Sequence, residues 1–196
     1  SLTIGVDLDK NVINIYYARV DGLSYTVNYV EKGNETNILH PAKVVDKQTF
    51  GNVITAADEI IDISGYNYDS VSADTITVGT DATKNVITIY YTRRVDLSYT
   101  VNYLEQGTEE VLATAKTVDK QVLGAEVTET AIDINGYVKP ETDTQKIVIA
   151  VEGNVINFYY TKKADLSYTV NYYEEGTVQK VAESKVVDKQ IFNATV

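Results

Sequence analysis

The chain has 196 residues, and its 17 Lys and Arg against 28 Asp and Glu give a formal charge of −11 at pH 7. This acidic balance excludes general binding to a nucleic-acid backbone, because neutralising phosphates needs an excess of basic side chains. The absence of cysteine excludes disulfides, thiolate metal sites and cysteine nucleophiles. The apolar runs are far shorter than the ~20 residues of a membrane span, so we expect no membrane insertion. Since the chain contains no methionine, we expect it to be a piece of a longer protein.

A long internal repeat determines the predicted organisation of the chain. The motif LSYTVNY occurs three times. A second motif also occurs three times, as NVINIYY, NVITIYY and NVINFYY. The distance from the second motif to the next copy of the first is constant, whereas the distances inside the repeats vary. We therefore predict four segments: the end of one repeat at 1–22, complete repeats at 23–96 and 97–165, and the start of a further repeat at 166–196.

The opening motif of each repeat predicts a half-buried strand. In the second complete repeat its apolar residues alternate with Ser98, Thr100 and Asn102, which is the two-residue period of a strand with one face in a core. A turn containing Gly107 then leads into a second apolar run at 111–118, so the two runs predict a β-hairpin.

The rest of the repeat predicts a second hairpin. After an irregular stretch at 121–143, in which we expect at most one helical turn, the apolar runs 146–151 and 154–160 flank the Glu152-Gly153 pair. The sequence thus predicts an all-β to α+β fold with two β-hairpins in each repeat.

Two further features concern the backbone and the junctions. Gly51, Gly124 and Asn193 occupy one equivalent position after each VDKQ motif, and because Gly and Asn tolerate positive φ we predict a left-handed turn there. The junctions contain basic pairs such as Arg93-Arg94, which we expect to bind acidic loop tips of the adjoining repeat. Their constant length predicts a stiff joint, and hence an elongated rod with neighbouring repeats as partners.

A set of core and turn residues recurs in the complete repeats. In the second one these residues are Val101-Asn102-Tyr103, Gly107, Gly136-Tyr137, Tyr159-Tyr160 and Lys162. With these residues and their equivalents in the preceding repeat, the whole chain resembles the MucBP repeat, the mucin-binding-protein module of Gram-positive surface proteins. The resemblance implies a small β-grasp-like fold, export to the bacterial cell surface or cell wall, usually in a long adhesin, and mucin or another host glycoprotein as a partner. It implies no particular residue as a ligand site.

The tyrosine doublets are the candidate ligand-binding residues. Neighbouring side chains in a strand point to opposite faces, so one ring of each doublet is expected in the core. The other ring either packs on an adjoining repeat or stands free to stack on a sugar. The six candidates are Tyr16, Tyr17, Tyr90, Tyr91, Tyr159 and Tyr160.

Other candidates for chemistry are weaker. His40 occurs in one repeat only, and we interpret it as an exposed loop residue. The Asp7-x-Asp9-x-Asn11 pattern resembles half of a calcium loop but lacks the glycine and the bidentate glutamate, which favours a solvated turn. An isopeptide cross-link would need buried lysines, whereas the VDKQ lysines have polar neighbours; the residues considered were Lys47, Lys120 and Lys189 with Asn28, Asn102 and Asn171.

No nucleophile–histidine pair, phosphate-binding glycine loop or metal-spaced cluster is present, so we expect no enzymatic activity, no cofactor and no metal. The sequence favours a surface stalk of tandem repeats with weak multivalent contacts to mucin or glycans. The alternative is a pure spacer or filament subunit that contacts only its own neighbours.

Overall fold

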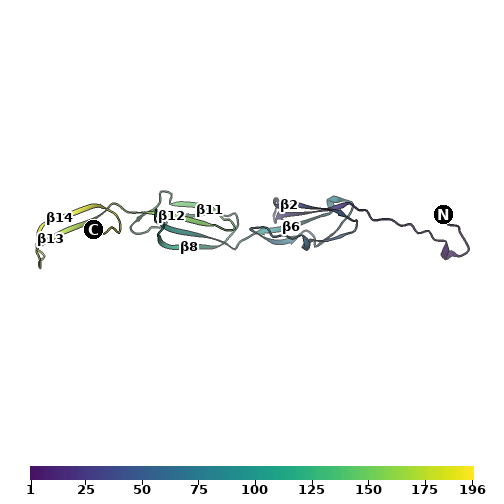
Figure 1. Ribbon diagram of the computed structural model, residues 1–196, viewed down its shortest axis with the longest axis horizontal. Coiled ribbons are helices and arrows are strands. Elements are labelled where there is room, and N and C mark those ends of the chain that lie inside the picture. Colours follow the sequence, from purple (N-terminus) through teal and green to yellow (C-terminus); the bar gives the residue numbers. More distant parts are fainter. The chain divides into compact units, whose positions relative to one another are not determined.

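Strands, turns and loops make up nearly all of the computed structural model, which describes residues 1–196 (Figure 1). The only helical elements are three 3₁₀ turns, and none is long or apolar enough to cross a membrane. The fold class is therefore all-β, and the stretch 121–143, where we expected at most one helical turn, contains none. The 3₁₀ turns are η1 (Leu8–Lys10), η2 (Ala56–Glu59) and η3 (Ala82–Lys84).

The chain divides into two units, residues 1–93 and 94–196. Unit 1 contains a four-stranded sheet with the order β2-β1-β6-β4 and a small two-stranded sheet of β3 and β5. In the large sheet β1 pairs antiparallel with β2 and parallel with β6, which pairs antiparallel with β4. The bounds are β1 (Leu23–Glu31), β2 (Asn34–Gln48), β3 (Val53–Thr55), β4 (Tyr66–Val71), β5 (Thr75–Thr77) and β6 (Val86–Arg93).

Unit 2 repeats this topology in its four-stranded sheet, β10-β12-β7-β8, which again has a central parallel pair, β7 with β12. A two-stranded sheet of β9 and β11 accompanies it, and the hairpin β13–β14 follows. The bounds are β7 (Leu97–Glu105), β8 (Val111–Gln121), β9 (Glu126–Thr130), β10 (Tyr137–Val138), β11 (Thr144–Val148), β12 (Val155–Lys162), β13 (Leu166–Tyr173) and β14 (Lys180–Gln190).

The predicted first hairpin is confirmed by β7–β8, but the predicted second hairpin is wrong. β11 does not pair with β12; it pairs antiparallel with β9, while β12 lies between β7 and β10. The Glu152-Gly153 turn therefore carries the chain from the small sheet to the large one. Pairing the last strand with the first closes the core of the repeat, which a local hairpin would leave open.

An asparagine amide holds this crossing in place. In unit 1 the Asn85 side chain accepts a hydrogen bond from the Gly79 N–H (2.9 Å) and donates to the carbonyls of Gly79 (2.8 Å) and Ser24 (3.0 Å). Asn154 makes the same three kinds of bond in unit 2, with Ala150 and Ser98. The asparagine of the NVI motif thus ties the crossing turn to the start of the first strand.

The predicted strand alternation is confirmed by the cores. In β7 the apolar side chains are buried and Ser98 is exposed, as the period of two requires. Each unit has a core of aliphatic and tyrosine side chains, and burying each ring contributes about 1.5–3 kcal/mol. The buried residues of unit 2 are Leu97, Tyr99, Val101, Tyr103, Ala131, Ile149, Ile156, Phe158 and Tyr160.

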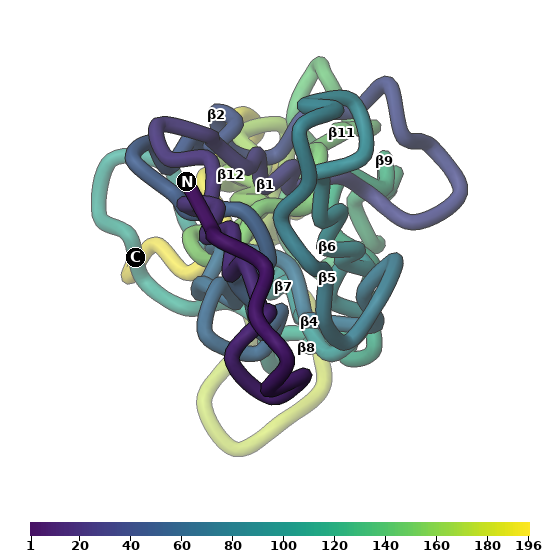
Figure 2. The backbone as a smooth tube through the Cα atoms, turned by 90° about the vertical axis from the view of Figure 1, so that its right-hand side faces the viewer, coloured from purple at the N-terminus to yellow at the C-terminus, as the bar shows by residue number.

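The same motifs are exposed where their partner strands are lacking. β13 has the LSYTVNY sequence of β7, but it pairs only with β14, and Tyr172 is 40% exposed where its equivalent Tyr103 is 4% exposed. The NVI motif at 11–17 likewise lies in the segment 1–22, which forms no strand (Figure 1; the purple end of the tube in Figure 2). A repeat therefore buries its tyrosines only when its first and last strands pair.

The left-handed turns predicted after the VDKQ motif are confirmed: φ is +85° at Gly51, +79° at Gly124 and +62° at Asn193. The lysine inside the motif also has positive φ, between 58° and 60° in its three copies, which the sequence did not indicate. In β2 this residue, Lys47, lies where the register with β1 shifts between the Leu23–Gln48 and Tyr25–Val45 pairs, so the motif forms a β-bulge.

A carboxylate at the edge of the core links three elements in each unit, Glu59 in unit 1 and the less buried Glu129 in unit 2. In unit 1, Tyr25 donates to Glu59 Oε1 (2.7 Å) and Lys43 Nζ donates to Glu59 Oε2 (2.6 Å). In unit 2, Tyr99 and Lys116 both donate to Glu129 Oε1, at 2.5 and 2.6 Å. The first strand, the second strand and the irregular middle of each repeat are thereby joined at the edge of the core.

This linkage makes stability sensitive to alkaline pH. Burial, followed by the hydrogen bond to the glutamate and its charge, raises the pKa of Tyr25 and of Tyr99 to about 12. Unfolded tyrosine titrates near 10, so the stability from these groups is fully present below pH ~10 and is lost as the pH rises toward ~12. We expect the midpoint of thermal unfolding to fall across this window, and to fall less in the Tyr25→Phe/Tyr99→Phe variant. Equal slopes for the two proteins would contradict the assignment.

The basic junction residues bind within their own repeat, contrary to our expectation. Arg93 Nε donates to Glu31 Oε1 (2.7 Å), and Lys162 Nζ lies 3.2 Å from Glu105 Oε1. Since the first and last strands run parallel, their ends lie at one edge of the sheet, where the glutamate that ends the first strand meets the basic residue.

A glycine–aromatic contact joins the hairpin β13–β14 to the preceding repeat within unit 2. Gly136 has φ +82°, and a Cβ atom there would lie 2.4 Å from the Phe192 ring. The Phe192 ring meets the Tyr137 ring edge-on, with 5.7 Å between centroids. Backbone bonds run from the Phe192 N–H to the Lys163 carbonyl (2.8 Å) and from the Lys163 N–H to the Gly136 carbonyl (2.9 Å).

We expect Gly136→Ala to release this joint. A side chain at positive φ costs about 1–2 kcal/mol, and the new methyl group would displace the Phe192 ring. Hydrogen exchange should accelerate at the Lys163 and Phe192 amides, while the amides of β7 and β12 keep their protection. Phe192→Ala provides the matched control that removes the ring without straining the backbone; unchanged exchange in both variants would show that the contact has no energetic weight.

Candidate functional site

The two tyrosines of each doublet have different surroundings in the complete repeats. Tyr91 and Tyr160 are 1% and 0% exposed, and their hydroxyls donate to the carbonyls of Ile61 (2.8 Å) and Ile132 (2.9 Å). They are core residues, so the structure removes them from the candidate binding surface. Tyr90 is half-buried and Tyr159 is 39% exposed, both on the opposite face of the sheet. The expected division of each doublet between core and outer face is therefore observed.

The N-terminal doublet is fully accessible. Tyr16 is 87% exposed and Tyr17 is 90% exposed, in a segment without strands. Because the same motif buries its second tyrosine in both complete repeats, this exposure reflects the lack of partner strands and does not indicate a binding surface. Tyr16 and Tyr17 therefore lie apart from any hollow of the folded repeats.

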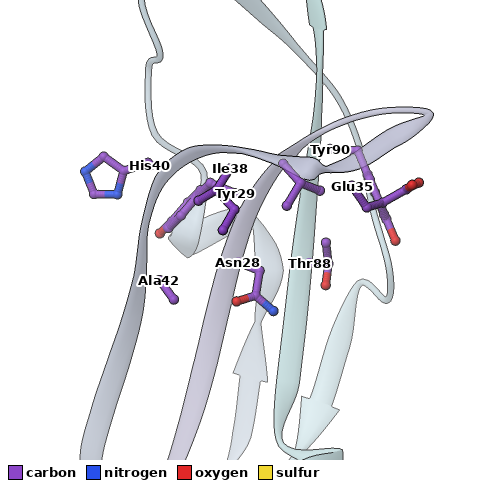
Figure 3. A pocket seen from close by; sticks show the side chains of 9 residues that line it. Asn28, Tyr29, Glu35, Ile38, His40, Ala42, Thr88 and Tyr90 are labelled. Carbon is purple, nitrogen blue, oxygen red and sulfur yellow. The ribbon is translucent and has the colours of Figure 1, made fainter.

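A hollow of about 300 Å³ opens on the outer face of unit 1, over β2, β1 and β6 (Figure 3). Asn28 and Thr88 reach it from the adjacent parallel strands, and Tyr90 and Glu35 lie at the end near the β1–β2 turn. The remaining lining residues are Tyr29, Val30, Ile38, His40 and Ala42.

Its polar groups are available for a ligand. The side chains of Asn28, Glu35, Thr88 and Tyr90 lie in the hollow and form no hydrogen bond within the chain, so they offer an amide, a carboxylate and two hydroxyls. Apolar side chains, including the 69% exposed Ile38, provide the remaining wall. A few polar groups set in an apolar wall are the usual composition of a small-molecule site.

The electrostatics of the hollow are negative. Glu35 is its only fully charged lining residue, and the neighbouring cations already have carboxylate partners: Arg93 binds Glu31 at 2.7 Å, and Lys43 binds Glu59 at 2.6 Å. The Arg93 and Asn37 hydrogen bonds hold the pKa of Glu31 below its usual range, which keeps this pair charged at neutral pH. No cation is left to face a ligand.

Unit 2 also has a hollow on the outer face of its large sheet. It lies on the β10 side of β12, whereas the hollow of unit 1 lies on the β1 side of the equivalent strand β6. Its volume is about 630 Å³, and Tyr159 and Asn157 line it at the positions of Tyr90 and Thr88. Here the Asn157 amide oxygen accepts a hydrogen bond from Asn102 Nδ2 (2.8 Å), so the equivalents of Thr88 and Asn28 are bonded to each other and offer fewer groups to a ligand. The other lining residues are Gln106, Val138, Lys139, Pro140, Glu141, Thr142, Gln145 and Thr161.

The sequence reasoning missed most of these lining residues. Tyr90 and Tyr159 were predicted, but Asn28 was considered only for a cross-link, and His40 only as a loop residue. His40 lies in β2, with its Nδ1 2.9 Å from the Pro41 carbonyl and its ring edge-on to Tyr29. Outward-facing polar residues at two-residue spacing on β1 and β6 would have indicated that these positions line a common surface.

The other candidates take structural roles. The Asn11 amide exchanges two hydrogen bonds with the Gly5 backbone, and Asp7 pairs with Lys10 at 3.1 Å. Lys47, Lys120 and Lys189 are exposed, whereas an isopeptide cross-link would need buried lysines. The chain holds no group of three or more His, Cys, Asp or Glu side chains that could bind a metal ion.

Comparison with known proteins gives a distant structural likeness. No protein-family model and no curated protein sequence match the chain. Among solved structures, it is similar to the type 2 repeat of the mucus binding protein MUB from Lactobacillus reuteri, with 16% identity and a TM-score of 0.28. The match covers 72% of this chain and 100% of that one.

Proposed function

We propose that the chain is a non-enzymatic repeat region of a bacterial cell-surface protein, which acts as a stiff stalk and binds mucin or other host glycans weakly through many repeats. The observation that carries the proposal is the recurrence of an outer tyrosine, Tyr90 or Tyr159, at a hollow on the same sheet face of both complete repeats. Aromatic rings next to amide and hydroxyl groups suit a sugar ring, which has an apolar face and polar edges.

The arrangement of the stalk is part of the proposal. The sheet order with its central parallel pair supports a β-grasp-like unit, as the MucBP resemblance implies. The Gly136–Phe192 contact supports a fixed joint between successive repeats, and hence a rod with neighbouring repeats of the same chain as partners. Export to the cell surface or cell wall likewise rests on the resemblance.

Binding should depend on the outer tyrosines. We expect Tyr90→Ala and Tyr159→Ala each to lower retention on immobilised mucin, by roughly tenfold if the lost ring contributes ~1.4 kcal/mol. The double variant should lose more, because linked weak sites reinforce one another. Surface plasmon resonance on a dense mucin surface measures the effect.

Tyr17→Ala is the matched control, since it removes an exposed ring outside both hollows and should retain binding. If the unchanged protein is not retained on mucin at high density, the glycan-binding part of the proposal is wrong. The alternative, a pure spacer or filament subunit that binds only its own neighbours, would then be favoured. The Gly136–Phe192 contact between successive repeats supports that alternative without any glycan site.

A further inference from the structure

We infer that the hollow of unit 1 takes a neutral sugar unit and discriminates against acidic sugars through Glu35, an inference that rests on the glycan binding proposed above. The hollow is bounded by Tyr90, Glu35 and Ile38 at the end near the β1–β2 turn and by Asn28, Thr88 and Ala42 along the strands (Figure 3). Nothing in the repeat pattern requires this combination of groups.

The hydrogen-bonding inventory points to a ligand with closely spaced hydroxyls. Asn28 offers a donor and an acceptor, Thr88 and Tyr90 each offer a hydroxyl, and ionised Glu35 can only accept. A carboxylate that can only accept needs a donor on the ligand, which a neutral sugar hydroxyl supplies and a sugar carboxylate does not. The ring of Tyr90 and the side chains of Ile38 and Ala42 leave an apolar wall for the carbon face of the sugar.

The charges around the hollow of unit 1 also favour a neutral sugar. Like charges a few ångströms apart repel, and they repel more strongly next to a protein surface than in water. No lysine or arginine lines the hollow, and three basic side chains of unit 1, Arg93, Lys32 and Lys43, are paired with Glu31, Asp69 and Glu59. The chain as a whole carries a formal charge of −11. A sialic acid or sulfate group would therefore meet uncompensated negative charge.

Unit 2 provides an internal contrast. In its hollow the Asn157 side chain is bonded to Asn102, and the charged lining residues are Lys139 and Glu141, of opposite sign. Lys139 also lies 3.0 Å from Asp133, but it lines this hollow, whereas no lysine or arginine lines the hollow of unit 1. We therefore expect weaker discrimination against acidic sugars at the hollow of unit 2, although both hollows contain the outer tyrosine.

The test compares one glycan in two forms, an N-acetyllactosamine conjugate and its α-sialylated counterpart, displayed at equal density. We expect the full chain to bind the neutral conjugate at least fivefold more tightly, and Tyr90→Ala to weaken binding of the neutral conjugate and to reduce this preference. Glu35→Gln removes the charge but keeps the shape, and should reduce the preference toward equality. Glu183→Gln is the matched control, an exposed carboxylate on β14 outside every hollow described above.

The outcomes separate the two proposals. Retention on mucin combined with equal or tighter binding of the sialylated form would overturn the neutral-sugar inference and leave the proposed function standing. A preference that Glu35→Gln does not change would also overturn it. Failure to bind mucin or either conjugate would overturn the proposed function itself. Circular dichroism of each variant shows that a lost signal is not lost folding.

Discussion

Replacing Asn85 with aspartate is expected to unfold unit 1 under conditions in which unit 2 remains folded. The substitution keeps the size of the side chain but removes the donor to the Gly79 and Ser24 carbonyls and places a charge at a site that is 1% exposed. Buried groups without partners cost about 1–3 kcal/mol each, and charged groups more, so we expect a loss of at least ~3 kcal/mol. Urea denaturation followed by tyrosine circular dichroism would show an early transition absent from the unchanged chain.

The chain offers graded controls for this experiment. Asn154→Asp removes the equivalent bonds in unit 2 at a less buried site, so its effect should be smaller and confined to the other transition. Asn11→Asp changes the same motif position in the segment 1–22 and should leave both transitions in place. A single unchanged transition in Asn85→Asp would show that the amide is not needed to close the sheet.

Tyr91→Ala and Tyr17→Ala are expected to differ strongly although both change the second tyrosine of the same motif. Tyr91 is 1% exposed and its hydroxyl bonds the Ile61 backbone, so truncation should cost about 3–5 kcal/mol as for other large core residues. Tyr17 is 90% exposed and its loss should change stability by no more than ~0.5 kcal/mol. Denaturant titration of the two variants measures the difference directly.

Tyr160→Ala should reproduce the large effect in unit 2. Because Tyr160 is 0% exposed and bonds the Ile132 carbonyl, its environment matches that of Tyr91. A comparable loss of stability in Tyr17→Ala would mean that the segment 1–22 contributes to the core of unit 1, contrary to the structure.

The elements that could be predicted from sequence are those specified by local periodicity. The alternation in LSYTVNY identified β1, β7 and β13, and the turn at Gly107 identified the first hairpin, because both signals depend on neighbouring residues. The pairing of β12 with β7 was not predicted, because a parallel partner lies over fifty positions away and leaves no trace in local spacing. The role of Asn154 in this crossing likewise becomes visible only once Ser98 lies beside it.

The candidate site was predicted at one residue per repeat. Alternation along a strand indicated that one tyrosine of each doublet faces outward, but not which one; the structure shows that these are Tyr90 and Tyr159 in the complete repeats. The rest of each hollow depends on which neighbouring strand or loop stands beside that ring. In unit 1 this is β2 with Glu35 and Ile38, whereas in unit 2 it is the connection between β10 and β11 with Pro140. Such differences arise from tertiary packing, and identical motifs cannot encode them.

The parallel pairing of the first and last strands has a mechanical consequence. β1 and β6 lie side by side from the Thr26–Val86 pair to the Glu31–Tyr91 pair, so tension applied to the two ends of the repeat slides one strand along the other. All the hydrogen bonds between them then bear load together, whereas a hairpin pulled from its open end yields one bond at a time. Each folded repeat therefore resists a pulling force along the chain, because the paired strands are the first and last strands of that repeat.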